Sequence, residues 1–165
     1  MASGKGKTME EIASFRINHL ELLPGLYKSR TDARGDCIVT TFDIRLTAPN
    51  REPAADIAAL HTIEHLGATY LRNSARRDDI VYFGPMGCRT GCYLVMFGDL
   101  EPQDVYGLIL EMCDFILEYD GEIPGATAIG CGNYLEQNLG MAKFYIQKYA
   151  AELRTNKRFE YPPIK

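Results

Sequence analysis

The segment His61-Thr62-Ile63-Glu64-His65 most limits how this chain can fold. On a helix that turns about 100° per residue, His61, Glu64 and His65 fall within one arc of roughly 100°. Apolar residues border that arc, and others form a second stripe, so we expect the helix of residues 54–77 to be sandwiched in the core. The two stripes consist of Ile57, Leu60, Ala68 and Leu71, and of Ala59, Ile63, Leu66 and Tyr70.

Two imidazoles and a carboxylate inside a core cost free energy unless they are paired or bound to something. The order H-x-x-E-H is that of the inverted zincins, in which the histidines bind a metal and the glutamate is the acid/base. The plainer interpretation is a buried helix whose histidines bond to backbone groups. Three polar groups on one arc favour the metal site over that interpretation.

Length and composition describe one ordinary globular domain. The 165 residues suffice to bury a core without disulfides, and 46% of them are hydrophobic and 24% charged. A net charge of -4 gives no reason to expect nucleic acid or an anionic membrane as partner. Because no apolar run approaches about 18 residues, we expect no membrane span. We expect residues 1–13 to be a disordered lead-in or tag and residues 14–165 to form a single catalytic domain.

The five cysteines are expected to be free thiols. The first residues, MASGKGKTMEEIAS, lack the apolar stretch of a signal peptide, so we expect a cytoplasmic, reducing location. Cys92 and Cys113 stand among apolar residues and are predicted to lie in the core. Cys37 begins a predicted strand and belongs to no motif.

Two cysteines stand in glycine-rich loops instead. Cys131 lies between two glycines, where the backbone can approach closely, as is typical of a loop ligand. Cys88 lies in a glycine turn beside Arg89, and a cationic neighbour favours the reactive thiolate.

The order of the elements predicts an α+β fold, in which an antiparallel sheet packs against helices around the central H-x-x-E-H helix. Asn133 is expected to cap the last helix. The tail from residue 154 to 165 is expected to be loose or packed on a neighbour. Residues 14–20 are predicted to be a first strand or an extended arm. Strands are predicted at residues 26–29, 37–47, 80–83 and 91–97, and helices at residues 54–77, 102–119 and 133–153.

The third metal ligand is left open by the residues alone. A catalytic site takes three protein ligands and keeps one position for water or substrate, and Cys131 is one candidate. Metallopeptidases of the pitrilysin type use a downstream glutamate, for which Glu136 is the candidate here, although those enzymes are much larger and have paired domains. With Cys88 as a fourth ligand, the site would be closed and structural.

Further short blocks accompany the H-x-x-E-H segment in a fixed order over roughly residues 14–152. They are Ser14-Phe15 with His19, Phe42-Asp43-Ile44-Arg45 followed by Pro49-Asn50, His61 to Leu66, Pro85-Met86-Gly87-Cys88-Arg89-Thr90-Gly91, and Cys131-Gly132. In this combination the chain resembles the LuxS family of S-ribosylhomocysteine lyases.

The resemblance implies one divalent metal per subunit, natively Fe²⁺ and often replaced by Zn²⁺ or Co²⁺, held by His61, His65 and Cys131. It implies cleavage of the thioether of S-ribosylhomocysteine to homocysteine and 4,5-dihydroxy-2,3-pentanedione. The second product is the precursor of autoinducer-2 in quorum sensing, and the pathway also serves the methyl cycle. Cys88 and Glu64 would move protons during carbonyl migration and β-elimination.

The resemblance also implies a homodimer with active sites at the interface. In the family the N-terminal segment comes from the partner subunit, and Ser14, His19 and Arg45 match positions that line the substrate pocket. No nucleic acid or membrane partner is implied.

The chain departs from the family at three positions. Asn18 stands where aspartate is usual, Tyr82 where an acidic residue is expected, and Gly130 where glutamine or glutamate is usual. These differences concern substrate contacts, and they leave the ligands and the acid/base pair unchanged.

Overall fold

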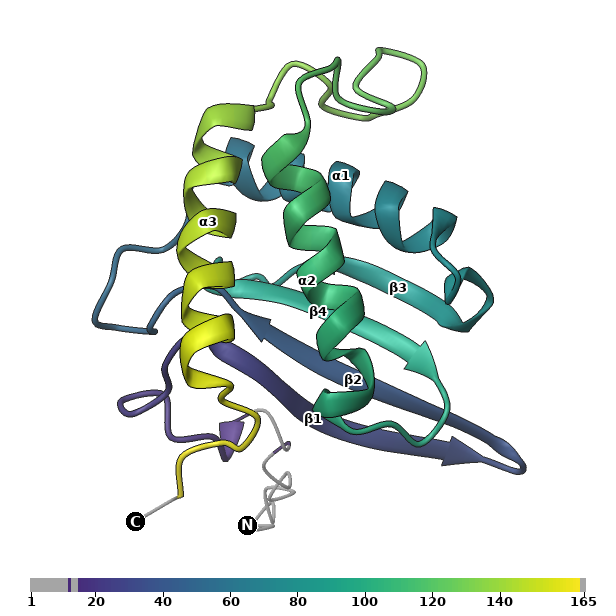
Figure 1. The fold of residues 1–165 in the computed structure, drawn as a ribbon, viewed down its shortest axis with the longest axis vertical. Helices are drawn as coiled ribbons and strands as arrows, with labels where there is room; N and C mark the ends of the chain where they lie inside the picture. Colours follow the sequence, from purple (N-terminus) through teal and green to yellow (C-terminus); the bar gives the residue numbers. More distant parts are fainter. Residues whose placement is uncertain (1–11, 13–14, 164–165) are drawn as a thin grey trace, which may run out of the picture.

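The structure, a computed structural model, describes residues 12 and 15–163. Within these residues four strands form one antiparallel sheet in the order β1-β2-β4-β3, and three α-helices cover one face of it (Figure 1). This is the α+β arrangement that the sequence predicts. The elements are β1 (Gly25–Arg34), β2 (Cys37–Arg45), α1 (Ile57–Asn73), the short 3-10 turn η2 (Arg77–Asp79), β3 (Ile80–Pro85), β4 (Gly91–Phe97), α2 (Pro102–Glu118) and α3 (Leu139–Asn156).

The core lies between the helices and the covered face of the sheet. Helix α1 packs over β3, whereas α2 and α3 pack together over β1. Side chains alternate along a strand, so Phe42 and Ile44 of β2 enter this core while Asp43 and Arg45 point to the opposite face. Cys92 and Cys113 are buried, as predicted. Helix side chains in the core include Ile63, Leu66, Ile109, Met112, Ile146 and Leu153.

Helix α1 is shorter than predicted, and one side of it is less buried than predicted. Asp56 caps its first turn by accepting a hydrogen bond from the backbone N–H of Ala59, and the chain is extended at Ser74. The prediction of a helix sandwiched in the core is wrong, because the side that carries the histidines faces a cavity. Ile57, on that side, is 52% exposed.

Three other local predictions are corrected. Residues 15–21 form turns rather than a strand or an extended arm, since backbone N–H groups bond to the carbonyl of Asn18. Strand β1 continues to Arg34, because it pairs with β2 down to a tight turn at Gly35, where φ is +59°. Asn138, not Asn133, caps α3 by accepting the N–H of Met141 at 3.0 Å.

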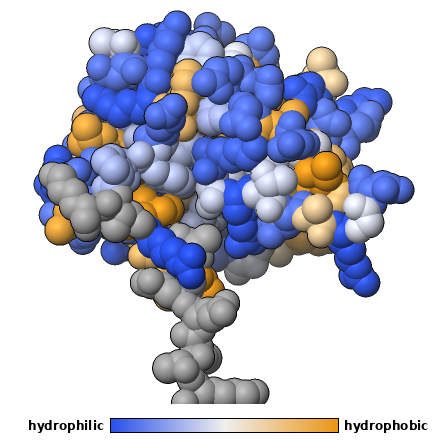
Figure 2. Space-filling view, turned by 90° about the horizontal axis from the view of Figure 1, so that it is seen from below, coloured by the Kyte–Doolittle hydropathy of each residue, from blue (hydrophilic) through white to orange (hydrophobic). Residues whose placement is uncertain are grey.

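The C-terminal segment, residues 157–163, packs on its own chain rather than lying loose. In Figure 1 it leaves the lower end of α3 and turns beside β1. The carbonyl of Arg158 accepts the N–H of Leu26 at 3.0 Å. Seen from this end, the surface is mostly hydrophilic with separate apolar patches (Figure 2). None of the helices in the described part of the chain is long and apolar enough to cross a membrane.

The predictions for residues 1–11, 13 and 14 lie outside the described residues. These include the lead-in or tag and the substrate contact expected of Ser14.

Candidate active site

His61 and His65 project from consecutive turns of α1 toward the loop that contains Cys131. Their Nε2 atoms lie 3.0 Å apart, and Cys131 Sγ lies 3.3 Å from Nε2 of His61. One ligand atom from each of the three residues lies within 4.8 Å of the others. Nitrogen and sulfur atoms about 2.0–2.3 Å from a common metal are spaced in this way.

The contact made by the outer nitrogen of each histidine, Nδ1, indicates the tautomer of its ring. His61 Nδ1 lies 2.9 Å from the carbonyl of Glu136, and His65 Nδ1 lies 2.6 Å from the carbonyl of Pro124. Because a carbonyl only accepts, these contacts favour the tautomer with the hydrogen on each Nδ1, which leaves a lone pair on each Nε2. Two lone pairs and a thiol that face one another are the donor set for a cation, so these residues fit a divalent metal.

The loop before α3 is held over α1 by groups that the sequence analysis missed. Thr62 is fully buried beside the first histidine, and its Oγ1 accepts the N–H of Asn138 at 2.9 Å. The same oxygen lies 2.8 Å from Oε1 of Gln137. On the other side of the cluster, the N–H of Cys131 bonds to the carbonyl of Thr127 at 2.9 Å. These bonds explain why a loop can present a ligand at a fixed place.

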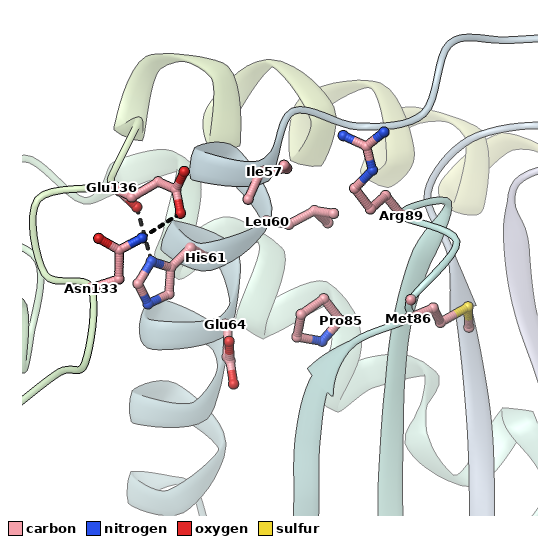
Figure 3. A pocket seen from close by; sticks show the side chains of 10 residues that line it. Ile57, Leu60, His61, Glu64, Pro85, Met86, Arg89, Asn133 and Glu136 are labelled. Atoms are coloured by element: carbon pink, nitrogen blue, oxygen red, sulfur yellow. Dashed lines mark hydrogen bonds between the residues drawn. The ribbon is translucent and has the colours of Figure 1, made fainter.

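Two cavities meet at Glu64. One, of about 310 Å³, lies between α1 and the turn that follows β3, and the other, of about 550 Å³, lies on the side of Pro124 and Cys131. Figure 3 shows Glu64 on α1 opposite Pro85 and Met86. A small substrate in the first cavity would therefore contact the carboxylate and one of the histidines together.

Cys88 lies in the tight turn between β3 and β4. The turn is closed by the N–H of Arg89 bonding to the carbonyl of Met86, at 2.9 Å. Cys88 is exposed as a residue, and its partly buried Sγ lies 3.1 Å from Oγ1 of Thr90 and 3.9 Å from Nη1 of Arg45. It is hydrogen-bonded to these groups and is not one of the three clustered residues that could hold a metal ion.

The environment of Cys88 favours its thiolate. Partial burial alone raises the pKa of the thiol, but hydrogen bonding to Thr90 and the positive charge of Arg45 outweigh it, and the pKa lies below the ordinary value. The sequence pointed to Arg89 as the cationic neighbour, whereas the hydrogen-bonded cation is Arg45. Thr90, two residues after the cysteine, was a sequence signal for a hydrogen-bond partner of the thiol, and the sequence analysis did not use it.

The remaining predicted residues lie as follows. Arg45 is only 2% exposed and forms an ion pair with Asp43. His19 is half-buried, and its Nδ1 lies 2.8 Å from the carbonyl of Ile17. Whether His19 and Arg45 contact substrate stays a prediction.

Glu136 was the alternative third ligand. Its carboxylate accepts a hydrogen bond from Nδ2 of Asn133 at 2.6 Å, and its backbone carbonyl bonds to the outer nitrogen of His61 (Figure 3). The carboxylate is not one of the three clustered ligand groups. This geometry favours Cys131 as the third ligand.

Comparison with known proteins gives the family. The sequence pattern of S-ribosylhomocysteinase (LuxS) matches residues 12–160 of this chain. The chain belongs to the LuxS family.

Several relatives in this family are similar over nearly their whole length. S-ribosylhomocysteine lyase of Finegoldia magna is 57% identical over 141 residues, which cover 86% of this chain and 90% of the relative. The lyase of Clostridium acetobutylicum is 54% identical over 157 residues, covering 93% and 99%. That of Desulfotalea psychrophila is 48% identical over 158 residues, with 93% and 99% covered. The resemblance seen in the short blocks is thereby confirmed.

Proposed function

We propose that this LuxS-family chain is a metal-dependent S-ribosylhomocysteine lyase, a carbon–sulfur lyase. It would cleave the thioether of its substrate to homocysteine and 4,5-dihydroxy-2,3-pentanedione, the autoinducer-2 precursor. The observation that carries the proposal is that three groups able to hold a metal ion converge beside two cavities that share Glu64. The family and the names of its relatives supply the substrate.

His61, His65 and Cys131 would hold one divalent metal. Two imidazoles and a thiolate bind iron, zinc or cobalt, so the ligand set does not select among them, and we propose Fe²⁺ as the native ion with Zn²⁺ or Co²⁺ as substitutes. The ion would supply a Lewis acid that polarises the sugar carbonyl and acidifies the adjacent C–H.

Cys88 and Glu64 would move the protons. A thiolate at the cavity can take a proton from the carbon beside the carbonyl, and the carboxylate of Glu64 can carry protons between oxygen atoms as the carbonyl migrates. In the β-elimination a C–H proton is removed, the C–S bond breaks, and its electron pair leaves with the sulfur of homocysteine. The lowered pKa of Cys88 supports this role because it increases the fraction of thiolate, the basic form, at a given pH.

Several further assignments belong to the same proposal. Ser14, His19 and Arg45 would line the substrate pocket, and residues 14–165 would act as a single catalytic domain in the cytoplasm, within the methyl cycle. The protein would be a homodimer with its active sites at the interface. Exposed apolar side chains support an interface of this kind, and they include Ile57, Ile129, Leu135 and Phe144.

A glutamine at position 64 tests the proposed proton carrier. Glu64→Gln keeps the shape of the side chain but cannot accept a proton, so thiol release from S-ribosylhomocysteine should fall by about 10²- to 10⁴-fold. Metal content, measured by mass spectrometry of the metal, should stay that of the wild type, because Glu64 lies outside the ligand cluster. Normal turnover in this variant would remove Glu64 from the mechanism.

A further inference from the structure

Beneath the turn of Cys88, on the face of the sheet away from the helices, lies a buried ion pair. Nη2 of Arg45 bonds to Oδ2 of Asp43 at 2.5 Å, and the two side chains are 3% and 1% exposed. Arginine does not lose its proton in proteins, and an uncompensated buried guanidinium is costly. We therefore take Asp43 to be ionised, although its burial raises its pKa.

Arg45 divides its hydrogen bonds between this carboxylate and the turn. While Nη2 holds Asp43, Nη1 donates to Oγ1 of Thr90 at 2.5 Å and lies 3.9 Å from Sγ of Cys88. The start of β4 can approach this end of β2 closely because β4 begins at Gly91, where a Cβ would overlap the carbonyl of Ile44. The more strongly Asp43 attracts Arg45, the less the positive charge of Arg45 stabilises the thiolate of Cys88.

Tyr161, from the C-terminal segment, reaches the same carboxylate oxygen. Its hydroxyl donates to Oδ2 of Asp43 at 2.9 Å, so it shares that atom with Arg45. Its ring stacks on Tyr27 of β1, with centroids 4.7 Å apart and planes 13° apart. Burial, and then the charge of Asp43, raise the pKa of Tyr161, so its hydroxyl keeps its hydrogen and remains a donor.

Other titratable groups also face this network. The charge of His19 acts on Asp43 and opposes the effect of burial on the pKa of that carboxyl. Tyr93 of β4 lies opposite Asp43 in the register, and the charges of Asp43 and Cys88 add to the effect of burial in raising its pKa. Arg45 is the cation that hydrogen-bonds to both the Asp43 carboxylate and the Cys88 thiol. It therefore links Tyr161, which bonds to Asp43, with Cys88.

We propose that Tyr161 is a positioning residue for Cys88, acting through Asp43 and Arg45. By donating to Oδ2, the hydroxyl of Tyr161 reduces the negative charge on that oxygen and weakens its attraction for Arg45. The guanidinium of Arg45 then interacts more strongly with Thr90 and with the thiol of Cys88. Without the hydroxyl, the carboxylate holds Arg45 more tightly and exerts more of its own negative charge on the turn. Both effects disfavour the thiolate, so the pKa of Cys88 should rise. The importance of this for catalysis rests on the proposed function, but the effect on the thiol does not.

The test is the pH profile of Cys88 alkylation in the metal-loaded, full-length protein. Trypsin cleavage after Arg77 and Arg89 frees a peptide in which Cys88 is the one cysteine. Mass spectrometry of this peptide therefore measures the reaction of iodoacetamide with Cys88 and with no other cysteine. In Tyr161→Phe the midpoint should move up by about half a pH unit, which is about three-fold less thiolate below the midpoint. Phenylalanine keeps the ring that stacks on Tyr27.

Tyr70→Phe is the matched control. That hydroxyl also donates to a carboxylate, Glu111 Oε2 at 2.8 Å, but on the helices α1 and α2 rather than at the ion pair. Its midpoint should equal that of the wild type. A midpoint in Tyr161→Phe that is unchanged or lower would overturn the proposal, as would an equal shift in the control. No substrate is used, so a protein without lyase activity could still show the shift, and the two proposals fail separately.

Discussion

Cys88→Ala is expected to release thiol from S-ribosylhomocysteine about 10²- to 10⁴-fold more slowly than the wild type while keeping its metal. The variant lacks the group that would take the proton from carbon. Its ligand cluster is intact, because Cys88 bonds to Thr90 and Arg45 rather than to the histidines. Thiol release under anaerobic conditions and metal content, measured on the same sample, separate the two effects.

Cys37→Ala provides the matched control. This residue is also exposed, but it begins β2 at the turn end of the β1–β2 pair, opposite Arg34 and away from the cluster. Rate and metal content should both equal those of the wild type. If Cys88→Ala instead empties the site, the cysteine is a fourth ligand and the closed, structural metal site gains support.

Cys131→Ala is expected to lose the metal itself. Removing a group that merely supports a ligand costs about 10- to 100-fold in metal affinity, and removing a ligand should cost more. After dialysis against a chelator of moderate strength, the variant should retain only a small fraction of the metal that the wild type keeps. Thiol release should fall with it and should not return on adding stoichiometric metal.

Glu136→Gln separates this ligand set from that of a metallopeptidase. The backbone carbonyl that orients His61 is unchanged by the substitution, and the lost carboxylate bonds only to Asn133 among the described contacts. The variant should keep its metal and its rate of thiol release. Loss of metal here, with full retention in Cys131→Ala, would show that the ligand set is wrong and favour the peptidase.

The sequence predicts the parts of the site that depend on short spacing. His61, Glu64 and His65 share one side of α1 because of helical periodicity alone, and their side chains meet as expected. Cys131 could not be assigned in the same way. It is 70 residues from His61, and it reaches the cluster through loop bonds to Thr127 and α1 that no local pattern encodes.

The fold class also followed from the pattern, but the limits of the elements did not. Strand β1 carries polar residues past Ser29 and is a strand there because β2 pairs with it. Asn138 was missed as a cap because Asn133 offers the same local signal five positions earlier, and the anchoring contact with Thr62 decides between them. The exposed side of α1 was misjudged because apolar residues such as Ile57 border a cavity there.

The most direct test of the central claim is anaerobic incubation of the purified protein with S-ribosylhomocysteine, followed by measurement of free thiol. Metal-loaded wild type should release homocysteine, the metal-free protein should not, and adding back Fe²⁺, Co²⁺ or Zn²⁺ should restore release. The absence of thiol from a folded, metal-loaded sample would contradict the account and direct the search to peptide substrates.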